Sequence, residues 1–118
     1  MPVICDFEFS IRLKDKKTCE QMCGTKGYMA PEILARQPYS FPVDIWSLGV
    51  MLYGLISEKL PFHVPSDALN DKNVLLAHDL IAYAEVDFYG SEWSNVSSSL
   101  KELLTGMLEK EPSERLDA

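Results

Sequence analysis

The chain has 118 residues, enough for one domain and short for two, and 47% of them are hydrophobic and 25% charged. This composition is typical of a globular protein and excludes an intrinsically disordered one. The net charge of −7 argues against a nucleic-acid partner, because binding to phosphate groups depends on Lys and Arg.

The longest apolar stretch, residues 43–56, is shorter than the roughly 20 residues that a helix needs to cross a bilayer. The N-terminus reaches Asp6 without the apolar run of a signal peptide. We therefore expect an intracellular, cytoplasmic protein without a membrane partner. Cys5, Cys19 and Cys23 are expected to be reduced thiols, since a metal site at the last two would need further ligands.

The elements expected in the first half of the chain are a strand, a loop and two helices. The apolar residues 3–5 predict a short strand, and the polar, aperiodic residues 12–22 predict a loop. Pro31 suits the first position of a helix, which must be short because Pro38 ends it. Residues 43–57 are apolar on nearly every side, which predicts a central helix surrounded by protein.

The second half of the chain is also expected to be helical. Residues 66–84 show a weak helical pattern, and residues 87–94 predict a loop with three aromatic side chains. An amphipathic helix is predicted at 98–110, with Ser99 and Glu102 at capping-box spacing. Its apolar stripe consists of Leu100, Leu103, Leu104, Met107 and Leu108. The predicted fold class is therefore mainly α, with a strand remnant and about four helices.

Several short motifs follow one another in a specific order. They are Asp6-Phe7-x, Ala30-Pro31-Glu32, Asp44-x-Trp46-Ser47-x-Gly49, Pro61-Phe62, and the run from Leu108 to Arg115. Each motif alone occurs often by chance, but the whole series with these gaps is specific. In this order the chain resembles the second half of a protein kinase domain of the Ser/Thr type, a partial C-terminal lobe that spans residues 1–118.

The resemblance implies ATP-dependent phosphoryl transfer to protein Ser or Thr, with Mg-ATP as the cofactor. It implies an activation segment at residues 6–32, in which Asp6 holds the metal ion. Without the later motifs, a surface Asp at a turn would be the simpler interpretation of this residue. Thr25 is expected to help order the catalytic loop, and its alternative is a solvated turn residue. The loop at residues 24–32 is expected to receive the protein substrate or another protein partner.

The resemblance also implies two structural roles. Glu32 and Arg115 would form a buried ion pair, and the geometry of a guanidinium group suits a carboxylate. These residues are 83 positions apart, so their pairing tests the fold. Asp44 would anchor the catalytic loop by accepting its backbone N–H groups, and an Asp is equally favoured there by the start of a helix.

Two positions depart from the kinase pattern. Glu8 stands where the family has glycine, so it restricts the hinge and adds a negative charge beside Asp6. This charge conflicts with ordinary metal binding at that site. Gln21 occupies the usual position of the controlling hydroxyl group, which leaves Thr18 as the candidate phosphorylation site.

Other kinase motifs do not occur in this sequence: the Gly-rich loop, the V-A-I-K lysine and H-R-D. His78-Asp79-Leu80 lacks the Arg and follows Ala-Pro-Glu, so it is rejected as a catalytic loop. We therefore expect the chain alone to be inactive and not to bind Mg-ATP. An alternative is a non-catalytic, kinase-like binding module, which Glu8 favours. An unrelated helical scaffold is disfavoured by the ordered motifs.

Residues 85–88 and 93–97 resemble those of the calcium/calmodulin-dependent group of kinases. In a whole kinase, one flank of the central helix is covered by elements that precede Asp6. We therefore expect this flank to be exposed here as an apolar patch.

Overall fold

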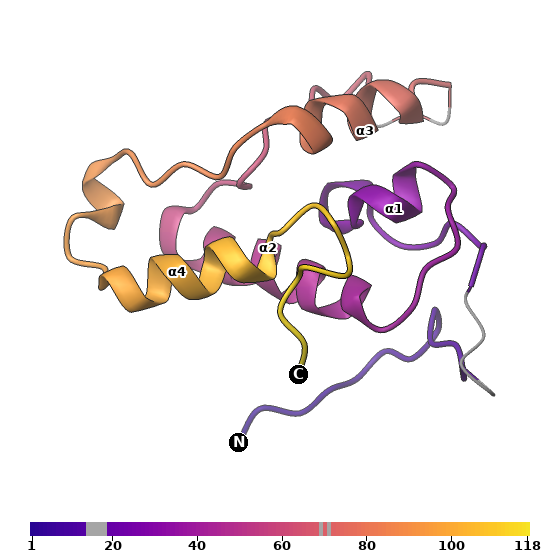
Figure 1. Cartoon of the computed structure of the whole chain (residues 1–118), viewed down its shortest axis with the longest axis horizontal. Coiled ribbons are helices and arrows are strands. Elements are labelled where there is room, and N and C mark those ends of the chain that lie inside the picture. The colour runs from indigo at the N-terminus through magenta and orange to yellow at the C-terminus, as the bar shows by residue number, and fades with distance from the viewer. Residues whose placement is uncertain (14–18, 69, 71) are drawn as a thin grey trace.

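The computed structural model describes residues 1–13, 19–68, 70 and 72–118. Within these residues the elements are the 3-10 turns η1 (Lys26–Tyr28) and η2 (Ser91–Trp93) and the helices α1 (Pro31–Leu34), α2 (Pro42–Ser57), α3 (Val74–Tyr83) and α4 (Ser98–Met107). The fold is therefore mainly α, as the sequence predicts. Figure 1 shows α2 and α4 across the middle of the molecule, with α3 along one side.

Helix α2 is the centre of the core. Proline at its first position has no N–H group to leave unpaired, and Glu58 ends the helix in the left-handed conformation, at φ 57°. Trp46 and Val50 on this helix are fully buried. At Gly49 a Cβ atom would lie 2.9 Å from the Cβ of Met107, so glycine permits the close approach of α2 and α4.

A second cluster of buried side chains lies at the other end of α2. Tyr53 packs 4.7 Å from Trp93 between ring centroids, and Phe88 packs edge-on against Trp93 at 4.9 Å. The hydroxyl group of Tyr53 donates a hydrogen bond to the carbonyl oxygen of Asp87, at 2.9 Å. Residues 87–94, predicted to be a loop, therefore include the turn η2 and contribute two aromatic residues to the core.

The N-terminal run does not form the strand predicted at residues 3–5. A strand is stable only when its backbone pairs with a neighbour, and residues 1–13 run extended below the helices (Figure 1). Among the described residues, the isolated bridge between Cys19 and Tyr39 is the one β pairing. Phe7 is 65% exposed, so this part of the N-terminal run adds no aromatic side chain to the core.

The weak helical pattern at 66–84 overestimates the length of α3, which begins only at Val74. A turn precedes this helix. The side chain of Asn70 accepts hydrogen bonds from the backbone N–H groups of Lys72 and Asn73, both at 3.1 Å. An Asn side chain that binds the backbone in this way favours a turn over a helix.

Helix α4 begins earlier than its capping motif suggested and ends earlier than residue 110. Its N-cap is Ser97, whose hydroxyl group accepts a hydrogen bond from the N–H of Leu100 at 3.2 Å, so the predicted cap at Ser99 is wrong. The helix ends at Met107, and Arg115 binds the carbonyl groups of Glu109 and Lys110 that follow it.

Helix α2 is not buried on every side. Leu48, Met51 and Leu55 are 49%, 52% and 76% exposed, so one flank of this helix is an open apolar surface. A groove of about 400 Å³ runs along it; the lining residues are Ile45, Leu48, Met51, Leu52, Leu55, Leu103, Met107, Leu116 and Asp117. We call this surface the α2–α4 groove.

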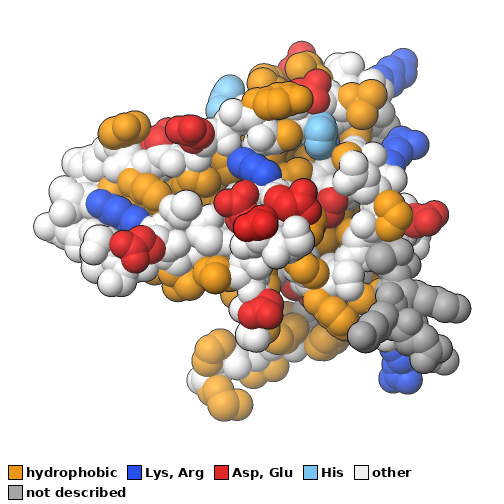
Figure 2. Space-filling model, viewed as in Figure 1, with side chains coloured by type: hydrophobic (Ala, Val, Ile, Leu, Met, Phe, Trp, Pro, Cys, Tyr) orange, Lys and Arg blue, Asp and Glu red, His pale blue; other side chains and the backbone are white. Residues whose placement is uncertain are grey.

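On the face shown in Figure 2, acidic side chains gather near the centre, and apolar side chains cover the N-terminal run below them. This distribution accords with the net charge of −7. None of the helices in the described part of the chain is long and apolar enough to cross a membrane.

Candidate functional site

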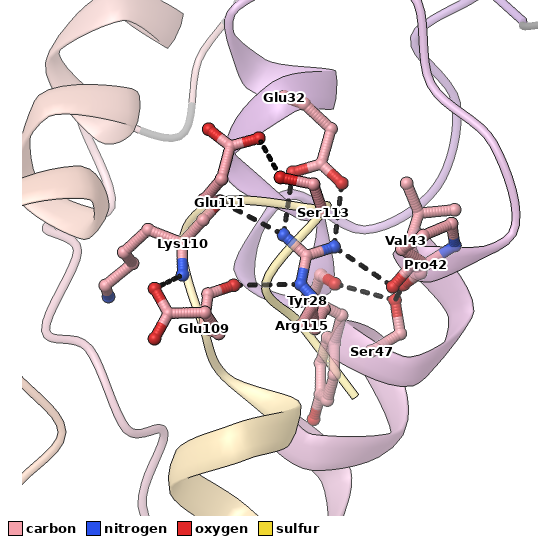
Figure 3. Close-up of polar contacts among 10 residues, drawn as sticks. All are labelled: Tyr28, Glu32, Pro42, Val43, Ser47, Glu109, Lys110, Glu111, Ser113 and Arg115. Atoms are coloured by element: carbon pink, nitrogen blue, oxygen red, sulfur yellow. Dashed lines mark hydrogen bonds and ion pairs between the residues drawn. The ribbon is translucent and has the colours of Figure 1, made fainter. Parts of the chain in front are cut away.

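The structure brings together the two residues that the sequence analysis paired across the chain. Glu32 lies in α1, and Arg115 lies in the segment that follows α4 (Figure 3). Nη1 of Arg115 donates to Oε1 of Glu32 at 2.7 Å, and Nη2 donates to Oε2 at 3.0 Å. The two side chains are 5% and 0% exposed, so the pair is bidentate and removed from water.

The remaining N–H groups of Arg115 bind backbone carbonyl groups. Nε donates to Glu109 at 2.8 Å, Nη1 to Pro42 at 3.0 Å and Nη2 to Lys110 at 3.2 Å. All five N–H groups of the guanidinium are therefore used. The group also lies 5.1 Å from the ring centroid of Trp46. Arg115 thus joins α1, the start of α2 and the segment after α4 around the main core.

Beside this pair lies a buried cation that the sequence analysis did not single out. Nζ of Lys110 is 3.6 Å from the ring centroid of Phe62 and 5.2 Å from that of Trp46, and these two rings are stacked. This nitrogen is buried without a hydrogen-bond partner among the described residues. Burial lowers the pKa of Lys110 to about 8, and the charge of Arg115 adds to this effect while Glu109 opposes it. In the sequence it lies between two glutamates, a setting typical of an exposed side chain.

Three of the predicted site residues line one cavity of about 520 Å³ between the N-terminal run, the loop before α1 and the start of α2. Asp6 is exposed, with a positive φ of 62°. Thr25 is exposed, and its carbonyl oxygen accepts a hydrogen bond from the N–H of Tyr28 at 2.9 Å. Asp44 is exposed in the first turn of α2. The three side chains come from distant parts of the chain and share this cavity.

The loop around Thr25 is tied to α2 by a serine hydroxyl group. Oγ of Ser47 lies 2.9 Å from the carbonyl oxygen of Tyr28 and 3.2 Å from that of Val43 (Figure 3). The contact with Tyr28 links η1 to the central helix. Sequence reasoning missed this role, although Ser47 stands within the motif around Trp46. Thr18, the candidate phosphorylation site, lies outside the described residues.

Comparison with known proteins identifies the family. A family model of the protein kinase domain matches residues 2–118. The chain belongs to the protein kinase family. Its helices are those of a partial C-terminal lobe, which confirms the predicted fold class.

Related kinases are of the Ser/Thr type, as the sequence predicts. The chain is 36% identical over 117 residues to a "Serine/threonine-protein kinase H1 homolog" from Pinctada fucata, covering 98% of this chain and 26% of that protein. It is 33% identical over 120 residues to a "CaM kinase-like vesicle-associated protein" from Xenopus laevis, with 98% and 31% covered. It is 36% identical over 113 residues to "Calcium-dependent protein kinase 22" from Arabidopsis thaliana, with 96% and 22% covered. The chain thus spans about a quarter of the length of these kinases.

The structure gives a physical reason for each residue of the kinase motif Asp44-x-Trp46-Ser47-x-Gly49. Asp44 faces the cavity, and Trp46 is a fully buried core residue that the Arg115 guanidinium contacts. Ser47 holds the loop before α1, and Gly49 admits α4. Residues 44–49 of α2 therefore line the cavity, pack in the core and hold the loop before α1.

The kinase family uses Mg-ATP, so the donor set for a metal ion is of interest. Asp6 is the expected ligand, and no group of three or more His, Cys, Asp or Glu side chains gathers in the described part of the chain as it would around a metal ion. Magnesium demands near-octahedral oxygen coordination and is usually bound through one or two carboxylates, substrate phosphates and water. One exposed carboxylate beside Glu8 does not make such a site by itself.

Proposed function

We propose that this chain supplies the substrate-docking part of a protein kinase that transfers phosphate from ATP to Ser or Thr residues of proteins. The observation that carries this proposal is the shared cavity of Asp6, Thr25 and Asp44, next to the clamp formed by Glu32 and Arg115. We call residues 24–32 the docking loop. A catalytic loop seated in this cavity would meet the carboxylate of Asp44 on α2 and the hydroxyl group of Thr25 in the docking loop. Both groups can accept its N–H groups and so hold it in place.

In this proposal the loop at residues 24–32 binds the protein substrate. It is held from two sides, by the hydroxyl group of Ser47 and by the ion pair of Glu32. Rigid support of this kind favours catalysis, because phosphoryl transfer depends on positioning and electrostatic stabilisation. The chain alone lacks the lysine, the catalytic Asp and the Asn of that chemistry, so we propose that it is inactive alone and binds no Mg-ATP by itself.

A second candidate function is a non-catalytic, kinase-like module that binds a protein partner. Glu8 favours it, because it places a second carboxylate two residues from Asp6 and replaces a flexible glycine. In this case the docking loop would bind its partner without any phosphoryl transfer.

A chimera distinguishes the two functions. The chain is fused to the preceding part of the kinase domain of the Pinctada fucata relative, and transfer of labelled phosphate from ATP to a mixture of Ser and Thr peptides is measured. Activity that is lost on replacement of Asp44 by Asn supports the catalytic proposal. A chimera that is folded and inactive, but active after Glu8→Gly, supports the binding module.

The role of Thr25 is tested in the same chimera. Thr25→Ala is expected to lower kcat at least tenfold, about 1.4 kcal/mol in the barrier, because the catalytic loop loses a contact that positions it. The matched control is Thr105→Ala on α4, where an exposed threonine binds only its own helix at the carbonyl group of Lys101. Equal effects of the two substitutions would contradict the role of Thr25.

A further inference from the structure

Two cysteines contact one tyrosine, Tyr39, just before the docking loop. The backbones of Cys19 and Tyr39 exchange two hydrogen bonds, of 2.8 and 2.9 Å. The Sγ atom of Cys23 lies 4.0 Å from the hydroxyl oxygen of the same tyrosine. Both cysteines and Tyr39 line the cavity described above. Residues 19–23 therefore form an arc around the tyrosine side chain.

The hydrogen bonds assign the donor in this cluster. The Tyr39 hydroxyl group donates its proton to the carbonyl oxygen of Gln21, at 2.5 Å. Its oxygen is then free to accept, so Cys23 is the S–H donor. Burial raises the pKa of Tyr39, and the side chains of Cys19 and Cys23 raise it further, so both thiols act on the same phenol. The thiol of Cys23 is thus held at the hydroxyl group of the same tyrosine whose backbone pairs with Cys19.

We propose that Cys19 and Cys23 are a redox pair that hydrogen peroxide converts to a disulfide. One thiol, as its thiolate, attacks a peroxide oxygen; the O–O bond breaks and a sulfenic acid and water form. The second thiol then attacks the sulfenic sulfur, the S–S bond forms and a second water molecule leaves. Two electrons pass from the two sulfur atoms to the peroxide, so the products are one disulfide and two water molecules.

The local backbone permits this reaction. Residues 19–23 lie outside any helix, so the arc can tighten until the two Cβ atoms reach the roughly 3.8 Å of a disulfide. Gly24, at a φ of 106°, and Thr25 follow directly, so the bond changes the path by which the chain enters the docking loop. This inference concerns the bond itself and stands whether or not the proposed kinase function is correct.

Peptide mass spectrometry of the full chain tests the proposal. Trypsin cleaves after Lys17 and Lys26, so a single peptide, residues 18–26, contains both cysteines. The chain is exposed briefly to hydrogen peroxide, and free thiols are then blocked with N-ethylmaleimide. The peptide is expected without N-ethylmaleimide and about 2 Da lighter than its reduced form, because disulfide formation removes two hydrogen atoms. This disulfide should form several-fold faster in the native chain than in about 6 M urea, which unfolds the chain.

Variants separate the pair from the other thiol. Cys5→Ser is the matched control: it removes the exposed cysteine and should leave the product unchanged. Tyr39→Phe keeps the backbone pairing with Cys19 and removes the hydroxyl group, so the disulfide should form more slowly. A predominance of disulfides that contain Cys5, equal rates in native buffer and in urea, or oxidation of Cys19 and Cys23 separately to sulfinic acids would each overturn the proposal.

Discussion

Glu32→Gln is the sharpest perturbation of this fold. The substitution keeps the shape of the side chain but removes its charge, and it turns an NH₂ group toward one of the two nitrogens of Arg115 that Glu32 now binds. The guanidinium then loses one charge-assisted hydrogen bond and its counter-ion, while its side chain stays fully buried. We expect a loss of about 3–5 kcal/mol in the free energy of unfolding, which is the usual cost of leaving a buried charge unpaired.

Urea unfolding followed by tryptophan fluorescence measures this loss. Trp46 is fully buried 5.1 Å from the guanidinium, so its emission reports on this part of the core. With a slope of about 2 kcal/mol per molar urea, the midpoint should fall by about 2 M. If the variant is already unfolded in buffer, the loss of hydrogen-exchange protection in α1 and α2 shows that the substitution costs at least the whole stability of the original chain.

The matched control is an exposed ion pair. Lys59 and Glu92 lie 3.7 Å apart at the surface, and Lys59→Gln should cost less than about 1 kcal/mol. A double variant, Glu32→Gln with Arg115→Met, should be less destabilised than the sum of the two single variants, because it leaves no unpaired charge. If Glu32→Gln were no more destabilising than Lys59→Gln, the clamp would not hold this fold together.

Three further predictions concern the core and the open flank. Lys110 has a pKa of about 8 in the folded chain and 10.5 in the unfolded chain, so between these pH values the folded state binds fewer protons. The free energy of unfolding should therefore rise from pH 8 to pH 10, and Lys110→Met should abolish this rise in urea titrations. Gly49→Ala should destabilise the fold by about 1–3 kcal/mol, because its Cβ would clash with α4. Gly54→Ala should stabilise α2, because its Cβ would meet no atom closer than 3.6 Å, and thermal unfolding compares the two variants. The purified chain should bind a hydrophobic dye through the α2–α4 groove, and replacing Met51 and Leu55 by Lys should reduce the fluorescence; an unchanged signal would place the dye elsewhere.

The sequence by itself determined the family and the helical class, through the order of the motifs, a proline that begins a helix and an apolar stripe. The pairing of Glu32 with Arg115 was predicted from the resemblance to protein kinases, and the structure confirms it. The bounds of the helices were less accurate, since Ser97 and Ser99 are both good caps and only the backbone path selects one.

Only the tertiary structure decided which side chains meet. Lys110 lies among charged neighbours in the sequence, and packing against Phe62 alone shows that its amine is buried. Cys19 and Cys23 contact Tyr39, and Asp6, Thr25 and Asp44 share a cavity, because segments that are distant in the sequence pack together. Burial and contact depend on residues that lie far apart along the chain. Periodicity within one segment does not show which distant side chains will pack against it.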